Sequence, residues 1–402
     1  MLDSLQLIYN RLLDETTMTF YRYLFDSLDL KSRLTGIVGP RGVGKTTLML
    51  QYIKKHINEL GKTFYFSADH IYFKDMTIYA FVEELFVKES IKTFFIDEIH
   101  KYPNWSQELK NLYDGFPDIK IIFSGSSSLD LIKGHYDLSR RGKVYKLPGL
   151  SFREYLNLKN GTKFSSYPFK TLIGDKENIC KKLAAEDGIL SEYHEYLKQG
   201  FYPFAQEDPL SYYEKLLAVV EKTIYEDIAN FYNLKTSNLR YLSKILNYLA
   251  TVPPGKISTY NLGKNLGIDD KTASGYLLML HETGLVDILY SSLAGNQGLR
   301  KPEKVFFNNT NLHNAIGGHA PTDIEIGTIR ELAFVQATKN AGLDVYHSKQ
   351  AEYQIQNYVF EVGGKNKTAK QIKALDESFL VKDDTLSVSK RTIPLFLLGF
   401  LY

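Results

Sequence analysis

Eight residues near the start of the chain, Gly39 to Thr46, combine the residue types that suit a phosphate group. They read GPRGVGKT and fit the pattern G-x-x-x-x-G-K-[ST]. The glycines let the backbone turn so that several N–H groups converge on phosphate oxygens, and the helix expected next adds its positive N-terminal end. Lys45 supplies a point charge to the β- and γ-phosphates, and the Thr46 hydroxyl can ligate Mg²⁺. The predicted contacts of a nucleoside triphosphate are Gly39, Pro40, Arg41, Gly42, Val43, Gly44, Lys45, Thr46 and Thr47.

Two adjacent acids, Asp97 and Glu98, follow a short apolar run, Phe94 to Ile96. Such a run is typical of a buried parallel strand, and open α/β sheets bind ligands at the carboxyl ends of their strands. Asp97 is the natural outer-shell partner of Mg²⁺, and Glu98 is placed to polarise an attacking water. We therefore expect the triphosphate to be hydrolysed rather than only bound.

Further polar residues follow a third apolar run, 119–123. Ser124 and Ser126 are candidates to contact the γ-phosphate or orient the water, but a serine here can equally cap the helix that follows. Arg140 or Arg141 is suited to stabilise the charge that develops on the phosphate in the transition state at the nucleotide site of a neighbouring subunit. An arginine pair can also bind surface carboxylates. An arginine that acts in this way implies a nucleotide-dependent homo-oligomer.

These groups need a sheet whose strands end at one edge. Apolar, strand-like runs occur at 34–38, 63–67, 93–97 and 119–123, and helical stretches separate them. Alternation of this kind predicts an α/β fold with a mainly parallel sheet.

In their order along the chain, the motifs resemble those of bacterial and archaeal AAA-superfamily ATPases that are usually named only "ATP-binding protein". The segments that carry the resemblance read GIVGPRGVGKTTL, FFIDEIHKYPNWSQELKNLYD, IIFSGSSSLDL and LSRRGKVYKLPGLSFREYL. The resemblance is close over residues 15–160 and looser beyond. It implies ATP and Mg²⁺ as ligands, and ATP is also favoured because no guanine-reading Asn-Lys-x-Asp follows the acidic strand. The residues that it carries over are Lys45, Thr46, Asp97 and Glu98, with the arginine at Arg140 or Arg141.

The middle of the chain predicts helices. Ser151 to Glu154 resembles a capping box at the start of a helical connector. Residues 238–290 then give helix, turn, two helices and a strand, the layout of a winged helix. The helix predicted over 269–283 is net acidic, which suits DNA phosphates poorly. We therefore favour a packing or protein-docking module over a DNA-binding one.

The tail, 326–402, resembles the restriction-nuclease-like end of the same family. Such a nuclease needs an acid on one strand and Glu-x-Lys on the next, converging on a metal ion. Gln354 stands where the family's Asp is expected, and an amide is a weaker Mg²⁺ ligand than a carboxylate. Glu361 and Lys365 are spaced more widely than Glu-x-Lys, although they could share a strand face. We expect a degenerate domain that ends in a strand over 391–398.

Composition limits the class of protein. The 402 residues carry 49 Lys+Arg and 46 Asp+Glu, a surplus of +3 that argues against a broad nucleic-acid coat. It leaves one basic run, Lys365 to Lys373, as a local patch, and a solvated helix face is the favoured interpretation of that run. A single cysteine excludes an internal disulfide and a cysteine-based zinc site. No apolar stretch reaches the about 18 residues of a membrane span, and no signal peptide is evident, so we expect a cytoplasmic protein.

Four parts are expected. They are a P-loop ATPase domain over 1–160, a helical connector over 161–235, a winged helix over 236–310 and a degenerate nuclease-like domain over 311–402. The favoured function is hydrolysis of Mg²⁺–ATP coupled to a protein or DNA partner. The alternatives are a nucleotide-gated scaffold or DNA-binding regulator with little turnover, and an ATP-dependent nuclease.

Overall fold

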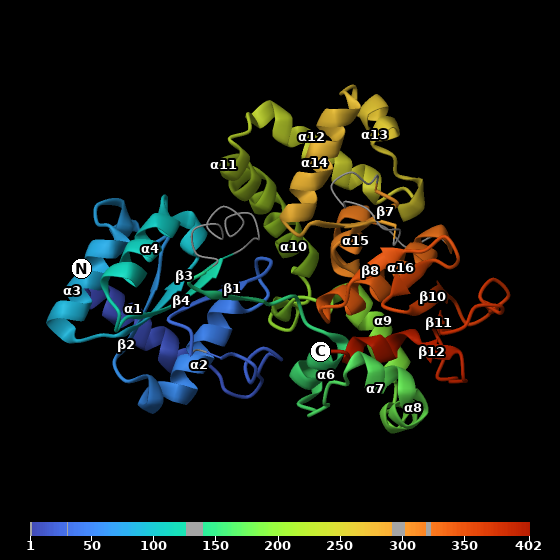
Figure 1. Cartoon of the computed structure of the whole chain (residues 1–402), viewed down its shortest axis with the longest axis horizontal. Helices are drawn as coiled ribbons and strands as arrows, with labels where there is room; N and C mark the ends of the chain where they lie inside the picture. The colour runs from blue at the N-terminus through green and yellow to red at the C-terminus, as the bar shows by residue number, and fades with distance from the viewer. Residues whose placement is uncertain (1, 30, 126–139, 292–301, 319–322) are drawn as a thin grey trace. The chain divides into compact units, whose positions relative to one another are not determined.

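The computed structural model divides the chain into two compact units, Met1–Gly149 and Leu150–Tyr402 (Figure 1). Across the residues that the structure describes, no helix is both long and apolar enough to cross a membrane. The described residues are 2–29, 31–125, 140–291, 302–318 and 323–402.

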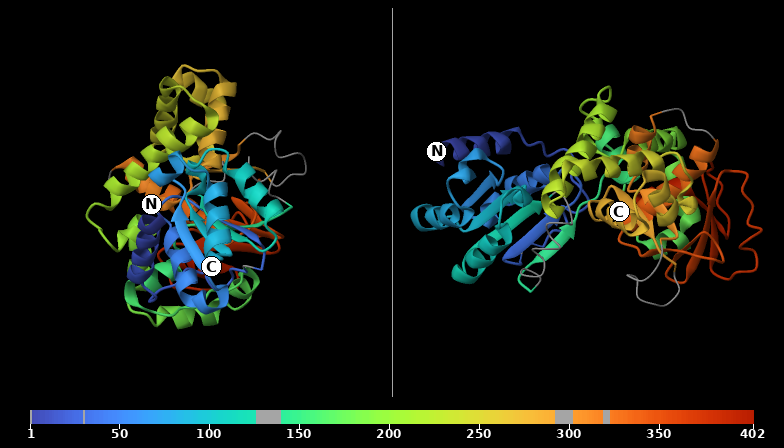
Figure 2. Two further views of the ribbon diagram at one scale, coloured as in Figure 1. Left: turned by 90° about the vertical axis from the view of Figure 1, so that its left-hand side faces the viewer. Right: turned by 90° about the horizontal axis from the view of Figure 1, so that it is seen from above.

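The first unit is built on a parallel five-stranded sheet with the order β2-β3-β4-β1-β5, and Figure 2 gives two further views of it. The four predicted strands are all present, and β1 and β3 are buried along their whole length. The strands are β1 (Leu34–Val38), β2 (Thr63–Ser67), β3 (Thr93–Asp97), β4 (Lys120–Gly125) and β5 (Lys143–Lys146). The edge strand β5 is a fifth strand that the sequence did not predict, because it is short, lysine-flanked and largely exposed.

Helices surround this sheet. They are α1 (Leu2–Glu15), α2 (Lys45–Leu60), α3 (Ile78–Glu89) and α4 (Trp105–Gly115), with short 3₁₀ turns η1 (Ile71–Lys74) and η2 (Ile99–Lys101). Helix α3 starts where the Thr77 side chain accepts a hydrogen bond from the Ala80 N–H. Aromatic rings fill the core beside β2, where Phe81 meets Phe64 and Phe66 edge to face at 5.8 and 5.2 Å between ring centroids.

The second unit begins with helices. The predicted capping box is confirmed, because Ser151 and Glu154 each bond the other's backbone N–H at the start of α6. The elements are α6 (Phe152–Asn160), α7 (Phe169–Gly174), α8 (Lys176–Ala184), α9 (Ile189–Gln199), η3 (Pro203–Ala205), α10 (Tyr212–Lys222), a π-helical segment η4 (Thr223–Ile228) and α11 (Ala229–Tyr232).

The order of helices and strand predicted over 238–290 is also present. Asp269 caps α14 by accepting a hydrogen bond from the Thr272 N–H at 2.9 Å, and Gly267 ends α13 in a left-handed conformation. The elements are α12 (Thr236–Leu249), η5 (Pro254–Lys256), α13 (Thr259–Leu266), α14 (Asp270–Glu282) and the antiparallel pair β6 (Val286–Leu289) and β7 (Lys304–Phe307).

The last part is a mixed five-stranded sheet with the order β12-β11-β10-β9-β8, preceded by α15 (Thr310–Gly317) and α16 (Asp323–Asn340). Strands β8, β9 and β10 pair antiparallel, whereas β10, β11 and β12 pair parallel. The strands are β8 (Val345–His347), β9 (Tyr353–Ile355), β10 (Tyr358–Gly363), β11 (Ser378–Lys382) and β12 (Thr392–Pro394).

The prediction of a strand over 391–398 is wrong beyond Pro394. The chain continues instead as a buried 3₁₀ helix, η7 (Leu395–Phe400). Pro394 has no N–H to donate to a further ladder bond, which favours an end to the strand there. An apolar run that is buried all round carries no periodicity, so the sequence could not distinguish a strand from a helix.

Candidate functional site

The phosphate-loop motif lies between β1 and α2, and its glycines are needed for two different reasons. Gly42 and Gly44 have φ values of 80° and 89°, in the left-handed region that favours glycine. A Cβ at Gly39 would lie 2.0 Å from the carbonyl oxygen of Leu147, so the backbone segments pack too closely for any side chain. The loop is therefore shaped by its own conformation and by the strand end beside it.

Lys45 is the first residue of α2, and its ammonium is folded back into the loop. The Nζ atom donates to the carbonyl oxygens of Gly39 and Pro40, each at 3.0 Å, and the residue is 5% exposed. Beside it in the loop, Val43 is buried and Thr47 is exposed. The positive charge is thus held within the loop, beside the carbonyl oxygens of Gly39 and Pro40.

Asp97 lies at the carboxyl end of β3 and accepts four hydrogen bonds. Its Oδ2 accepts from the hydroxyls of Thr46 and Tyr65, the latter at 2.8 Å. Its Oδ1 accepts from the Ser124 hydroxyl and, at 3.1 Å, from the Glu98 N–H. The structure therefore brings Thr46, Asp97 and Glu98 together, as the sequence predicted.

Tyr65 is a member of this network that sequence reasoning missed. It lies in the middle of β2, the strand beside β3, and is 4% exposed. Burial, and secondly the neighbouring Asp97 carboxylate, raise the pKa of the Tyr65 hydroxyl, so it stays protonated and donates. Its only sequence signal is a hydroxyl within an otherwise apolar strand, which is too weak to assign a partner.

Glu98 follows Asp97 in a left-handed conformation, with φ of 50°. Its N–H donates to both Asp97 Oδ1 and Ser124 Oγ at 3.1 Å, which fixes the backbone. Burial raises the pKa of its carboxyl, and the nearby Lys45 charge opposes that shift. The carboxylate thus lies in the field of the phosphate-loop lysine, where an attacking water would need a base.

His100 is a second residue that the sequence analysis missed. Its Nε2 lies 3.4 Å from Glu98 Oε2, within ion-pair range, and its side chain is only 3% exposed. Oε2 is buried and accepts no hydrogen bond. The imidazole therefore lies against the carboxylate that is predicted to act on water.

The remaining predicted residues lie elsewhere. Ser126 falls outside the described residues, and Ser124, from the same strand tip, supports Asp97. Arg140 is exposed. Arg141 forms a bidentate pair with Asp114 of α4, with Nε–Oδ1 and Nη2–Oδ2 distances of 3.0 Å. The surface pairing considered for these arginines is thus the arrangement that Arg141 adopts.

Arg22 also contributes to the loop, although no motif marked it. This arginine is 5% exposed and donates through Nη1 to the carbonyl oxygen of Val43. Through Nη2 it donates to the carbonyl oxygens of Pro148 and Gly149, at 2.7 and 2.9 Å. One guanidinium therefore joins the phosphate loop to the segment in which the first unit ends.

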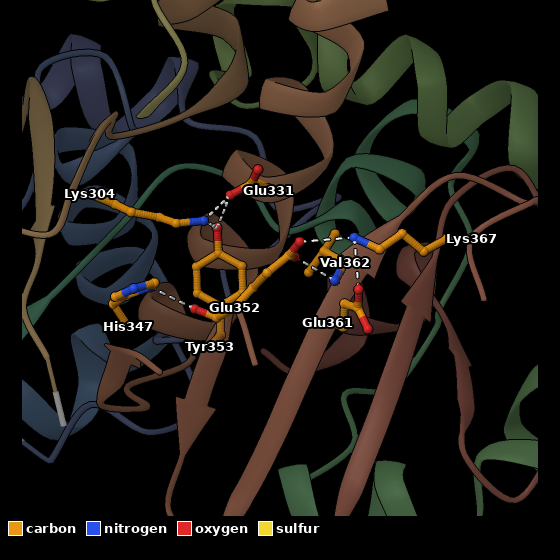
Figure 3. A network of polar contacts seen from close by, with 8 residues as sticks. All are labelled: Lys304, Glu331, His347, Glu352, Tyr353, Glu361, Val362 and Lys367. Atoms are coloured by element: carbon orange, nitrogen blue, oxygen red, sulfur yellow. Dashed lines mark hydrogen bonds and ion pairs between the residues drawn. The ribbon is translucent and has the colours of Figure 1, made fainter. Parts of the chain in front are cut away.

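In the C-terminal sheet, the prediction that Glu361 and Lys365 share a strand face is wrong. Strand β10 ends at Gly363, so Lys365 lies beyond it, with a 65% exposed side chain 3.5 Å from Asp384. Gln354 donates to the backbone oxygen of Gln356 next to it. Figure 3 shows instead that Lys367 reaches Glu361.

The basic run Lys365 to Lys373 is also not a helix face. The segment forms turns, and two of its lysines, Lys365 and Lys367, are paired with acids. The run is therefore less positive than its sequence suggests.

Two family models match separate parts of the chain. Residues 31–156 match a family model described as an AAA domain, and residues 190–323 match a domain of unknown function, DUF8612. The uncharacterized protein MJ1637 of Methanocaldococcus jannaschii is 31% identical over 291 residues, which cover 69% of this chain and 61% of that protein. The chain thus spans about three-fifths of the length of this relative.

Solved structures are more distant. A replication initiator DnaA bound to AMPPCP and single-stranded DNA is 16% identical, with 68% of this chain and 86% of that chain covered and a TM-score of 0.26. AMPPCP-bound DnaA from Aquifex aeolicus is 15% identical, with 69% and 87% covered and the same TM-score. Scores this low support no conclusion about this chain.

The family match, the parallel sheet and the glycine-rich loop agree on the N-terminal part. They support an AAA domain there, whereas residues 190–323 match a domain without an assigned role. Residues 31–156 form an AAA-type P-loop domain, a fold that implies nucleotide binding.

Proposed function

We propose that this protein is an ATPase that binds Mg²⁺–ATP in the loop Gly39–Thr46 and hydrolyses it to ADP and phosphate. The observation that carries this proposal is the network around Asp97. One carboxylate links the hydroxyl of Thr46, at the end of the loop, to the backbone of Glu98. A nucleotide-binding loop, a metal-binding pair and a base are thereby held in one rigid arrangement.

The residues present fit the ligands. Mg²⁺ prefers oxygen donors, and the Thr46 hydroxyl and an Asp97 carboxylate oxygen lie in contact. The closely packed Gly39 and the left-handed Gly42 and Gly44 leave the loop without side chains that would obstruct a phosphate. When bound, Mg²⁺ supplies charge neutralisation for the phosphates. The ammonium of Lys45 would move from its carbonyl partners to the phosphate oxygens.

Glu98 is the base in this proposal. Its carboxylate accepts the proton of the attacking water, and Lys45 favours the ionised form that this requires. The left-handed backbone and two N–H contacts fix where the side chain begins. The His100 imidazole lies 3.4 Å from the far oxygen, Oε2, and limits the space into which the carboxylate can turn.

Two variants test the proposal. Lys45→Ala should weaken Mg²⁺–ATP binding by roughly 10- to 100-fold, since a hydrogen bond to a charged group contributes about 1.5–3 kcal/mol. Glu98→Gln should keep the affinity and lose ~10²-fold or more in kcat, the usual contribution of a general base. Lys55→Ala on the exposed side of α2 and Glu89→Gln at its exposed site are matched controls. Wild-type turnover in Glu98→Gln would refute the hydrolytic mechanism.

The division into an ATPase over 1–160, a connector over 161–235, a winged helix over 236–310 and a degenerate nuclease-like domain over 311–402 is part of the proposal. Helices α12 to α14 followed by the β6–β7 pair support the winged helix. The net acidic α14 favours a protein partner over DNA for this module. Salt-sensitive DNA binding by the full chain would contradict that choice.

A further inference from the structure

Two carboxylates face each other across strands β9 and β10. The antiparallel pairing of Phe360 with Tyr353, continued by one residue, places Glu361 opposite Glu352. Glu352 Oε2 accepts the Val362 N–H at 2.8 Å, so its side chain lies along β10. Glu361 is 1% exposed and the Glu352 side chain 25% exposed. Two acids held this close, with one fully buried, need a positive charge between them.

Lys367 supplies that charge. Its Nζ lies 3.0 Å from Glu352 Oε1 and 3.0 Å from Glu361 Oε1 (Figure 3). Burial lowers the pKa of Lys367, but its contacts with the two carboxylates outweigh burial and raise it. The ammonium therefore stays charged and bridges the pair.

The backbone is shaped to let this lysine in. A Cβ at Gly363 would lie 2.5 Å from Lys367 Cδ and 2.8 Å from its Cβ and Cγ. The aliphatic stem of Lys367 thus rests directly on the glycine at the end of β10. Any larger residue at position 363 would push the ammonium away from the carboxylates.

The Lys367 ammonium lies between two carboxylates, where a metal ion could bind, and it carries a positive charge as a metal ion does. Glu361 Oε2 is buried without a hydrogen-bond partner, so the pair keeps an unused oxygen. Mg²⁺ is commonly held by one or two carboxylates, with waters and substrate phosphates completing its shell. Figure 3 also contains a third acid, Glu331, which forms an ion pair with another lysine, Lys304. Among the described residues, no group of three or more His, Cys, Asp or Glu side chains could hold a metal.

We propose that the Lys367 ammonium is a built-in cation that occupies a divalent-metal site between Glu352 and Glu361. The C-terminal sheet is thus complete without metal, and the site opens to a divalent cation only when the lysine leaves. This inference is independent of the ATPase proposal, because it concerns a different unit and different residues.

The test is Mn²⁺ binding by the nucleotide-free full-length protein, measured by isothermal titration calorimetry. Lys367→Ala should gain a site, about one per chain, at least roughly tenfold tighter than any Mn²⁺ binding by wild type, and this bound ion should raise the melting temperature. Lys365→Ala, which removes an exposed lysine of the same segment, should behave like wild type. The Glu361→Gln/Lys367→Ala double variant should lose the gained site.

Two outcomes overturn the proposal. One is Mn²⁺ binding by wild type that disappears in Glu361→Gln, because the site would then hold metal with the lysine in place. The other is a folded Lys367→Ala that gains no site. If Lys367→Ala does not fold, Gly363→Ala displaces the lysine stem and leaves every charge present. That variant should gain Mn²⁺ binding, and a folded Gly363→Ala with wild-type Mn²⁺ behaviour would refute the proposal.

Discussion

The buried imidazole of His100 lies 3.4 Å from the Oε2 atom of Glu98, on the turn that directly follows the acidic pair. This contact restricts the orientations that the proposed base can adopt. We predict that His100→Ala lowers kcat by roughly tenfold, a part of the ~10²- to 10⁴-fold that a positioned base contributes. The KM for ATP should change little, because the contact that motivates this variant is with the proposed base and not with a proposed ATP ligand.

Steady-state kinetics of His100→Ala, Glu98→Gln and the double variant check this prediction. The double variant should be no slower than Glu98→Gln, since the histidine acts only through the glutamate. His100→Gln, which keeps a polar group, should recover part of the rate. Additive losses in the double variant would mean that His100 acts by another route.

Tyr65→Phe should weaken the proposed Mg²⁺ site at Thr46 and Asp97. It removes one of the four donors to the buried Asp97 carboxylate, and a hydrogen bond to a charged group contributes about 1.5–3 kcal/mol. We expect a lower urea midpoint for the N-terminal unit and a higher Mg²⁺ concentration for half-maximal ATPase rate. Tyr21→Phe, in the same unit but outside this network, is the control. A Mg²⁺ dependence identical to wild type would show that Tyr65 does not orient Asp97.

Arg140 and Arg141, which are adjacent, should have different roles. Because Arg141 is held by Asp114, we predict that Arg140 is the one that reaches a neighbouring subunit's nucleotide. Arg140→Ala should then lower kcat only at protein concentrations where native mass shows an ATP-dependent oligomer. Arg141→Ala should keep wild-type turnover. A monomer with and without ATP would remove the in-trans role altogether.

The second unit should become less stable as pH rises. The Asp383 carboxylate raises the pKa of His194, whose Nε2 lies 3.5 Å away. A raised pKa means that the stabilising contribution is present below the unfolded value of about 6.5 and is lost as pH rises through the folded value. Wild type should therefore lose more stability than His194→Gln when pH is raised across this range, as thermal unfolding at several pH values can measure. Parallel curves would contradict the prediction.

The phosphate site was predictable because its residues are consecutive. The spacing of Gly39, Gly44 and Lys45 predicts the loop. The apolar run before Asp97 predicts the strand that ends at this acid. Periodicity and apolar runs also predicted four of the five strands in the first sheet. These signals are local, so one sequence contains them in full.

The residues that were missed act across distances that one sequence does not encode. Tyr65 meets Asp97 only because β2 pairs with β3 in a particular register. Lys367 replaces the predicted Lys365 because β10 ends at Gly363 and the chain turns back over that glycine. Both depend on backbone geometry that spacing alone does not define.

Arg22 connects the phosphate loop of the first unit to the residues at which that unit ends. The Arg22 guanidinium donates hydrogen bonds both to Val43 in the phosphate loop and to Pro148 and Gly149, the last residues of the unit. A shift of the loop would strain or break these bonds. A shift of the loop at Val43 would therefore act directly on the residues at which the first unit ends.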